Sequence, residues 1–330
     1  MPNPTASDVH VNAALTNISV AYMQEENSFV ADRVFPIVPV AKQSDRYFVY
    51  DKGDFFRSEA QLRAPGTASA GSGFGIDNTP SYFADVYAIH KDIDDQIRAN
   101  SDAAINPDRD ATLYVTQQLM MRRELTWAST FFTNGIWTGG VQAGGGAGDV
   151  GVADLLNGAW SAAGSTPIED VDKQADNMQR LTGYRPNKMV VGTQVHRVLK
   201  NHPDVLDRIR YTQEGIVTEQ LLASLLGVDE YMVARATNNT AAAGAADVMA
   251  NIAGQDDALL CYAAPNPGLM TPSAGYLMAW NGFLGAGGQG NRIKRFRMEH
   301  LASDRIEGEL AFAAELVSAE LGAFFLNCVT

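Results

Sequence analysis

The chain has 330 residues, 46% of them hydrophobic, and its 25 basic and 38 acidic residues give a formal net charge of −13. Affinity for phosphate backbones and anionic membranes depends on clustered Lys and Arg, so this balance argues against a general nucleic-acid or membrane binder. Charge or glycine interrupts every apolar stretch before 18 residues, and the N-terminus lacks a basic segment followed by an apolar one, so we expect neither a membrane span nor a signal peptide.

The first clear pattern is RVFPIVPVAKQSDRYFVYDKGDFFR at 33–57. Pro36 and Pro39 donate no backbone hydrogen bond and hold their neighbours extended, so this segment cannot pair fully as a central strand. Its apolar side chains still need cover, which a neighbouring copy can supply. We therefore predict an arm at 1–43, followed by a hairpin at 45–56 whose turn is DKGD.

Two helices have strong boundary signals. Asn106 can cap a helix that begins at Pro107, and Asn134-Gly135 ends it. The predicted helix is on the order of 40 Å long. Thr166-Pro167-Ile168-Glu169 has the form of a capping box for a second helix, which Gly183 stops. The longer helix is predicted to act as a spine with these residues near one side: Leu113, Leu119, Met120, Trp127 and Phe131.

Short strands and helices alternate over 186–282, which favours a compact α/β subdomain. The predicted strands lie at 189–191, 231–234, 259–263 and 276–280, and the predicted helices at 194–200 and 219–226. At 306–324 the apolar period favours a helix, although the same residues permit two strands around a turn.

Chemical motifs are weak throughout. Gly285-Ala286-Gly287-Gly288-Gln289-Gly290 matches G-x-G-x-x-G, but only 40 residues follow it, too few for the units of a dinucleotide site. Cys261 and Cys328 lack metal-ligand spacing and are interpreted as reduced, buried thiols, and the histidines are mostly isolated. We therefore predict no catalytic residues, no cofactor, no metal site and no enzyme.

The one dense basic patch consists of Arg292, Lys294, Arg295 and Arg297. On a strand, the period of two places Arg292 and Lys294 on one face and the other two on the opposite face. Ion pairing with an acidic neighbouring surface is the preferred interpretation of this patch. Contact with nucleic acid is the alternative.

Several stretches in succession resemble the major capsid proteins of tailed bacteriophages, the Hong Kong 97-like shell family. They are the segment at 33–57, EAQLRAPGTA, YFADVYAIHKDIDDQIRAN, YRPNKMVVGTQVHRVLKNHPDVLDRIRY, DALLCYAAPNPG and GYLMAWNG. The order and spacing agree over about residues 15–330, and it is their succession that is specific.

The resemblance implies an α+β fold of the Hong Kong 97-like capsid type. Its parts would be an N-terminal arm at 1–43, an extended loop at 44–90 lying across an adjacent subunit, a peripheral domain with the spine helix at 91–183, an axial domain at 184–285, and a C-terminal return into the peripheral domain at 286–330. For the C-terminus the resemblance implies strands, and we follow it over the helical period.

The implied function is that of a structural major capsid protein, which self-assembles into the hexamers and pentamers of an icosahedral head enclosing double-stranded DNA. It would reside in the virion and assemble in the host cytoplasm. The predicted inter-subunit contacts are Phe35, Ile37 and Val38 of the arm, Tyr47, Tyr50, Phe55, Phe56 and Arg57 of the loop, and Arg292, Lys294, Arg295 and Arg297. Deletion of residues 44–90 is expected to leave a soluble chain that does not assemble.

The implied partners are other copies of the chain, a portal protein, and a decoration protein where one is present. A long charged helical leader is missing before the arm, so a separate scaffolding protein is expected. DNA would be enclosed without sequence-specific binding, and no membrane is involved. Two alternatives stay open: an encapsulin-like nanocompartment shell around enzyme cargo, and a soluble α/β enzyme that uses residues 184–282.

Overall fold

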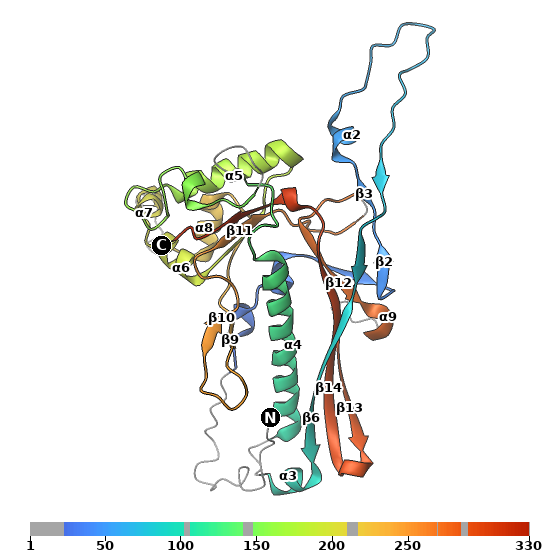
Figure 1. Ribbon diagram of the computed structural model, residues 1–330, viewed down its shortest axis with the longest axis vertical. Coiled ribbons are helices and arrows are strands. Elements are labelled where there is room, and N and C mark those ends of the chain that lie inside the picture. The colour runs from blue at the N-terminus through green and yellow to red at the C-terminus, as the bar shows by residue number, and fades with distance from the viewer. Residues whose placement is uncertain are drawn as a thin grey trace.

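The computed structural model describes residues 23–101, 106–140, 148–209, 217–268, 270–284 and 290–329. The molecule is elongated: a long sheet and one long helix run side by side, a compact α/β unit lies at one end of them, and a loop projects beyond both (Figure 1). Residues 1–22 of the predicted arm and most of the glycine-rich motif at 285–290 lie outside the described residues.

The long sheet is built around β14 (Ser303–Leu316). β6 (Asp85–Asp94) pairs with it antiparallel, from Ser303↔Asp94 to Phe312↔Asp85. β13 (Asn291–Met298) and then β12 (Gly275–Trp280) also pair with it antiparallel, and β1 (Ile37–Val40) lies parallel to β12. The strand predicted at 276–280 therefore belongs to this sheet and not to the α/β subdomain, which is a correction.

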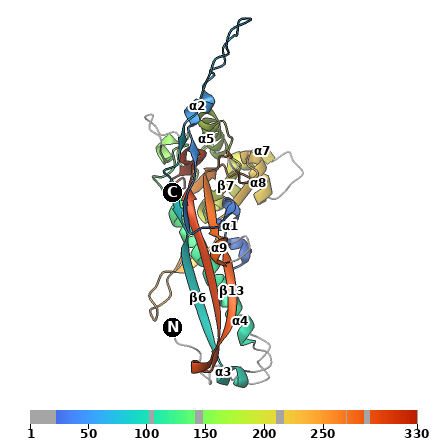
Figure 2. The same ribbon diagram turned by 90° about the vertical axis from the view of Figure 1, so that its right-hand side faces the viewer.

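The spine helix α4 (Pro107–Phe131) lies along one face of this sheet (Figures 1 and 2). It begins as predicted, with the Asn106 side chain accepting a hydrogen bond from the backbone amide of Arg109 at 3.2 Å. The packing is tight, because a Cβ atom on Gly308 of β14 would overlap Val115 and Leu119 of α4.

Of the side chains predicted to lie on one side of α4, three are buried: Leu119, Trp127 and Phe131. Leu113 is exposed and Met120 is half-buried, which corrects that part of the prediction. The sheet is contacted through Val115 and Leu119, four residues apart, and at 3.6 residues per turn Leu113 points roughly away from that stripe.

The compact unit has a second sheet with the order β15 (Gly322–Phe325), β11 (Ala258–Cys261), β7 (Lys188–Val191) and β8 (Glu230–Val233). Its helices are α5 (Pro167–Thr182), α6 (Thr193–Lys200), α7 (Pro203–Ile209) and α8 (Glu219–Leu226). The α/β texture predicted here is confirmed, and α8 has its predicted bounds.

Helix α5 ends at Gly183, whose φ of 77° is left-handed, as the glycine predicts. Its predicted capping box is wrong. Within the described residues the Thr166 side chain caps no amide of the helix; its hydroxyl accepts a hydrogen bond from Asn157 Nδ2 at 3.1 Å.

The C-terminus consists of strands, so the resemblance was right and the helical period was wrong. Ile306, Leu310 and Ala314 of β14 are each four residues apart, and on a strand this spacing keeps them on one face, the face on which Gly308 packs against α4. The same spacing also fits one side of a helix, so it imitated a helical period. β15, however, joins the compact sheet beside β11. The predicted return into the peripheral domain at 286–330 therefore holds only as far as β14.

The proline-containing segment is an edge strand of the chain's own sheet. Pro39 of β1 lies in register with Ala279 of β12, and an edge strand of this kind tolerates a residue that has no amide donor. Phe35, after the short helix α1 (Ala31–Val34), is 1% exposed, and its ring centroid lies 4.5 Å from that of Phe131. The expectation that a neighbouring copy covers Phe35 is corrected.

The local hairpin predicted at 45–56 is also wrong. β2 (Ser44–Arg46) pairs with β5 (Ser81–Phe83), and β3 (Val49–Tyr50) pairs with β4 (Ile76–Asp77), so one long loop spans 44–83. The DKGD segment begins α2 (Lys52–Phe56), where the Asp51 carboxylate accepts the Gly53 amide. Residues 85–90, predicted as loop, belong to β6.

The smaller elements of the described residues are α3 (Asp95–Asn100), α9 (Asn281–Leu284), β9 (Thr237–Asn239), β10 (Met249–Asn251), and the 3₁₀ turns Glu26–Ser28, Val152–Asp154, Glu299–Leu301 and Ala319–Leu321.

Candidate assembly surfaces

The extended loop presents apolar surface to solvent. Its two legs leave the body together and run beyond the rest of the molecule (Figure 1). Leu62 has a relative exposure of 103%, so its side chain is fully open to solvent. The other large apolar side chains left exposed on this loop are Phe48, Phe55, Phe56, Phe74, Ile76 and Phe83. Burial of one such side chain is worth roughly 1.5–3 kcal/mol, so contact with a partner that buries this surface would be strongly favourable.

The base of the projection is internally ordered. The rings of Tyr50, Phe55 and Phe74 form a triangle with centroid separations of 5.5–6.1 Å. The Asp54 carboxylate accepts the Gly75 amide at 2.9 Å and joins the two legs. Two of the predicted contact residues, Tyr50 and Phe55, are thus brought together, with Phe74 as a third member that the sequence interpretation missed.

The other predicted loop residues lie elsewhere. Tyr47 packs at the foot of the loop in a small cluster with Tyr82 and Met278. Arg57 pairs within the loop, with Asp54 at 3.7 Å and Glu59 at 3.5 Å. Leu62, between Gln61 and Arg63, and Phe74, between two glycines, were missed because each is a single large apolar residue that no local period places in a core.

The predicted arm residues lie within the chain's own sheet. Phe35 is buried, and Ile37 and Val38 of β1 are half-buried, with Ile37 packed against the core that contains Phe35. The surface they leave for a neighbouring subunit is therefore smaller than the sequence suggested.

The basic patch lies on β13 with the predicted division between faces. Arg292 and Lys294 pair with Glu309 of the neighbouring β14, at 2.6 and 2.8 Å. On the opposite face Arg295 pairs with Asp304 at 2.6 Å, and Arg297 pairs with Asp95 through two bonds of 2.6 Å. All four cations have acidic partners in their own chain. This corrects the interpretation that they form their ion pairs with an acidic surface of a neighbour.

Asp304 is the centre of this network. Its carboxylate accepts from Arg295 at 2.6 Å and from Arg98 at 2.7 Å, and these charge-assisted bonds lower its pKa to about 2. Arg98 also pairs with Asp108 in the first turn of α4 at 2.8 Å. The network therefore ties β13, β14, α3 and α4 together at the end of the sheet far from the compact unit.

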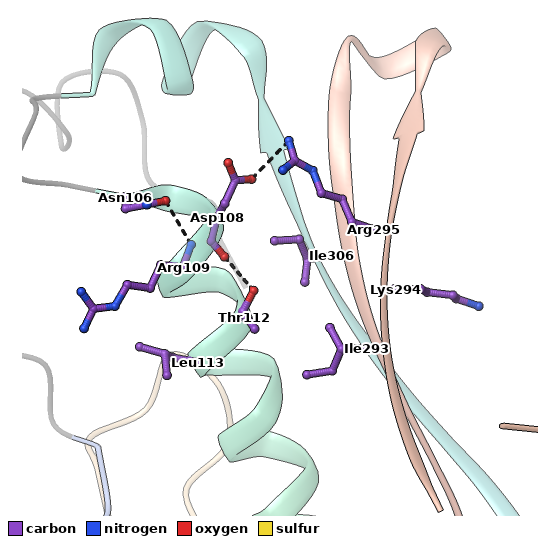
Figure 3. A pocket seen from close by; sticks show the side chains of 9 residues that line it. All are labelled: Asn106, Asp108, Arg109, Thr112, Leu113, Ile293, Lys294, Arg295 and Ile306. Atoms are coloured by element: carbon purple, nitrogen blue, oxygen red, sulfur yellow. Dashed lines mark hydrogen bonds and ion pairs between the residues drawn. The ribbon is translucent and has the colours of Figure 1, made fainter. Parts of the chain in front are cut away.

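An open groove of about 470 Å³ lies beside the first turns of α4. Figure 3 shows Arg295 reaching toward Asp108, 3.7 Å away, while Lys294 points away from the helix. The lining residues are Asn106, Asp108, Arg109, Thr112, Leu113, Ile293, Lys294, Arg295 and Ile306. This lining combines paired charges with apolar walls and brings together neither a nucleophile with a base nor a set of metal ligands.

Polar pairs in the compact unit resemble catalytic pairs but serve the fold. Ser165 Oγ lies 2.9 Å from His202 Nε2, yet both residues are buried and the same hydroxyl bonds the carbonyl of Ala162. His196 Nδ1 lies 3.2 Å from the hydroxyl of Tyr231, and burial lowers the pKa of both imidazoles. In the part of the chain that the structure describes, no group of three or more His, Cys, Asp or Glu side chains could hold a metal ion.

Both cysteines are free and buried, as predicted. Burial raises the pKa of the Cys261 thiol to about 12, which leaves little thiolate for chemistry. Among the described residues, no helix has the length and apolar character needed to cross a membrane.

A buried carboxylate connects the N-terminal segment to the spine. Glu124 of α4 is 1% exposed, and its oxygens accept the backbone amides of Val30 at 3.0 Å and Ala31 at 2.9 Å. Next to it Arg123 pairs with Asp32. Burial raises the pKa of Glu124 to about 7, although the two amides act in the opposite direction.

Comparison with known proteins gives these surfaces a context. Residues 150–261, the greater part of the compact unit, match the family model described as phage major capsid protein E. The major capsid protein of the Burkholderia phage BcepMu is 26% identical over 228 residues, which cover 68% of this chain and 69% of that protein.

Solved structures share the fold. The mature capsid of bacteriophage PhiM1 superposes with a TM-score of 0.60 at 12% identity, covering 96% of this chain and 92% of that one. An encapsulin of Synechococcus elongatus superposes with a TM-score of 0.57 at 12% identity, covering 96% of each chain. The fold is therefore common to both kinds of shell, whereas the family model and the relative found by sequence point to phage. On these matches the chain is similar to phage major capsid proteins and has the Hong Kong 97-like fold.

Proposed function

We propose that this chain is a major capsid protein, which self-assembles into the hexamers and pentamers of an icosahedral head that encloses double-stranded DNA. The exposed apolar loop carries the proposal: Leu62 is fully exposed on a projection that leaves the body of its own molecule. Many modest contacts of this kind around a closed symmetry stabilise an assembly without one tight interface.

Within such a shell, the loop at 44–83 lies on the next subunit. Tyr50, Phe55 and Phe56 supply its seat near the base, while Leu62 and Phe74 extend the contact outward. The compact unit has the role of the axial domain, and the long sheet with α4 has the role of the peripheral domain. The intramolecular network around Asp304 keeps the far end of that sheet rigid.

The charge of the chain suits a container. A net charge of −13 discourages DNA from adhering to the wall, so DNA is enclosed without sequence-specific contacts. The role in the virion places assembly in the host cytoplasm, with a separate scaffolding protein, a portal protein and, where one is present, a decoration protein as partners.

A deletion confined to the projection tests the proposal. Removal of residues 44–90 would also cut into β6, so we choose Ser58–Gly73 replaced by a short Gly-Ser turn, which leaves β3, β4 and α2 in place. We expect wild type, expressed with its scaffolding protein, to form shells in negative stain and fast-sedimenting particles. The deletion should stay slow-sedimenting with an unchanged melting temperature.

A point variant refines the test. Leu62→Asp should impair assembly, whereas Ser72→Asp adds the same charge at an exposed polar position of the same loop and should not. Normal shells from the deletion would contradict the proposal. Particles that hold protein and no nuclease-resistant DNA after infection would favour the nanocompartment alternative.

A further inference from the structure

The base of the extended loop touches the body of the same molecule through α2. Lys52 at the start of this helix forms an ion pair with Glu320, 268 residues further along the chain. At its other end, the Phe56 ring lies against Gly183, where an added Cβ would come within 3.0 Å of Cζ. Phe56 remains largely exposed, so the contact uses one edge of the ring.

The body side of this contact is firmly held. Glu320 lies in the 3₁₀ turn between β14 and β15, whose Ala319 carbonyl accepts the Thr138 amide at 3.0 Å. Leu321, the next residue, is buried, and its carbonyl accepts the Tyr262 amide at 2.9 Å. The turn that carries Glu320 is thus hydrogen-bonded to two separate segments of the body, at Thr138 and at Tyr262.

On the loop side, α2 is connected to both legs. Asp51 caps it, Asp54 bonds to the opposite leg at Gly75, and Phe55 packs on Phe74. The pairs that connect the legs to each other, β2 with β5 and β3 with β4, are only three and two residues long. Pairs this short resist bending weakly, and the cluster of Tyr47, Tyr82 and Met278 lies at the foot of the loop. Above the foot, the direction of the projection therefore depends on what holds α2.

We propose that the Lys52–Glu320 ion pair, together with the seat of Phe56 on Gly183, is a tether that sets the direction of the extended loop before subunits meet. Lys52 and Glu320 are positioning residues in this scheme. The inference rests on the proposed function, because a preset direction matters only if the loop must find a second copy. A loop already oriented for binding avoids the entropy cost of ordering it at the interface.

The size of the effect follows from the exposure of the pair. Both side chains are 42% exposed, and ion pairs at such positions shift a two-state equilibrium by up to about fivefold. This shift in the equilibrium of loop directions applies to each subunit separately. Formation of a ring that needs every loop correctly directed is therefore reduced more strongly than the population of one correctly directed loop.

The test reads loop direction and assembly separately. Spin labels on Ser58→Cys in the loop and Gln179→Cys on α5 report their distance in the unassembled chain, and the native cysteines are buried. We compare wild type, Lys52→Glu, Glu320→Lys and the double variant that restores the pair with reversed charges. Lys42→Glu is the matched control, because Lys42 pairs only three residues away with Asp45 and joins no separate parts.

We expect a broader distance distribution and assembly slowed at least severalfold in each single variant, with both restored in the charge-reversed double variant and unchanged in Lys42→Glu. A wild-type distribution in the single variants, or a double variant no better than either single one, would overturn the tether. If wild type formed no particles, the proposed function would fail, while the distance measurement would still decide whether the tether exists.

Discussion

Substitution of Glu124 should change how stability depends on pH. This carboxylate is buried where α4 meets the N-terminal segment, and it accepts the amides of Val30 and Ala31. Burial raises its pKa from 4.5 to about 7, so the folded chain binds a proton more tightly than the unfolded one. Stability from this group is full below pH 4.5 and is lost as pH rises through 7.

The magnitude follows from the two pKa values. A rise from 4.5 to about 7 corresponds to roughly 3 kcal/mol of unfolding free energy, since one pKa unit is worth about 1.4 kcal/mol. Glu124→Gln keeps an oxygen for the amides and removes the titration. The free energy of unfolding of the variant, relative to wild type, should therefore rise by up to about 3 kcal/mol between pH 4.5 and pH 8.

Urea unfolding of the dilute, unassembled chain at several pH values measures this difference. Trp127 is buried one helical turn from Glu124 and provides a fluorescence signal. Glu26→Gln, on the exposed part of the same segment, is the matched control and should follow wild type. A difference between Glu124→Gln and wild type that stays constant with pH, or grows as pH falls, would refute the reasoning.

Two further predictions concern packing and the acidic network. Phe35→Ala should lower the unfolding free energy of the unassembled chain by about 3–5 kcal/mol in urea titrations, because the ring is buried against Phe131; an unchanged midpoint would mean that a neighbouring copy covers it. Arg295 and Arg98 lower the pKa of Asp304 to about 2, so this carboxylate stabilises the fold above pH 3.8 and loses the effect as pH falls toward 2. Asp304→Asn should therefore flatten that part of the acid-unfolding curve, followed by circular dichroism. Superimposable curves of the variant and wild type would count against this prediction.

Sequence alone determined the elements whose signals are local. Asn106 and Pro107 mark the start of α4, and Gly183 marks the end of α5, because caps and left-handed glycines act within one helical turn. The two faces of β13 followed from the period of two. The resemblance in the order of several stretches supplied the shell fold and the strands of the C-terminus.

Only the tertiary structure decided which partners those elements have. The DKGD segment has the composition of a hairpin turn, but the strands before it, β2 and β3, pair with residues 76–83 and not with the residues directly after it. The segment therefore closes no local hairpin, and it begins α2 instead. Phe35 and the arginines of β13 have apolar and acidic partners within the chain, though local sequence could not say whether these lie in the same molecule. Pairing and burial depend on residues hundreds of positions apart, such as Lys52 and Glu320, and a local pattern has no information about such distances.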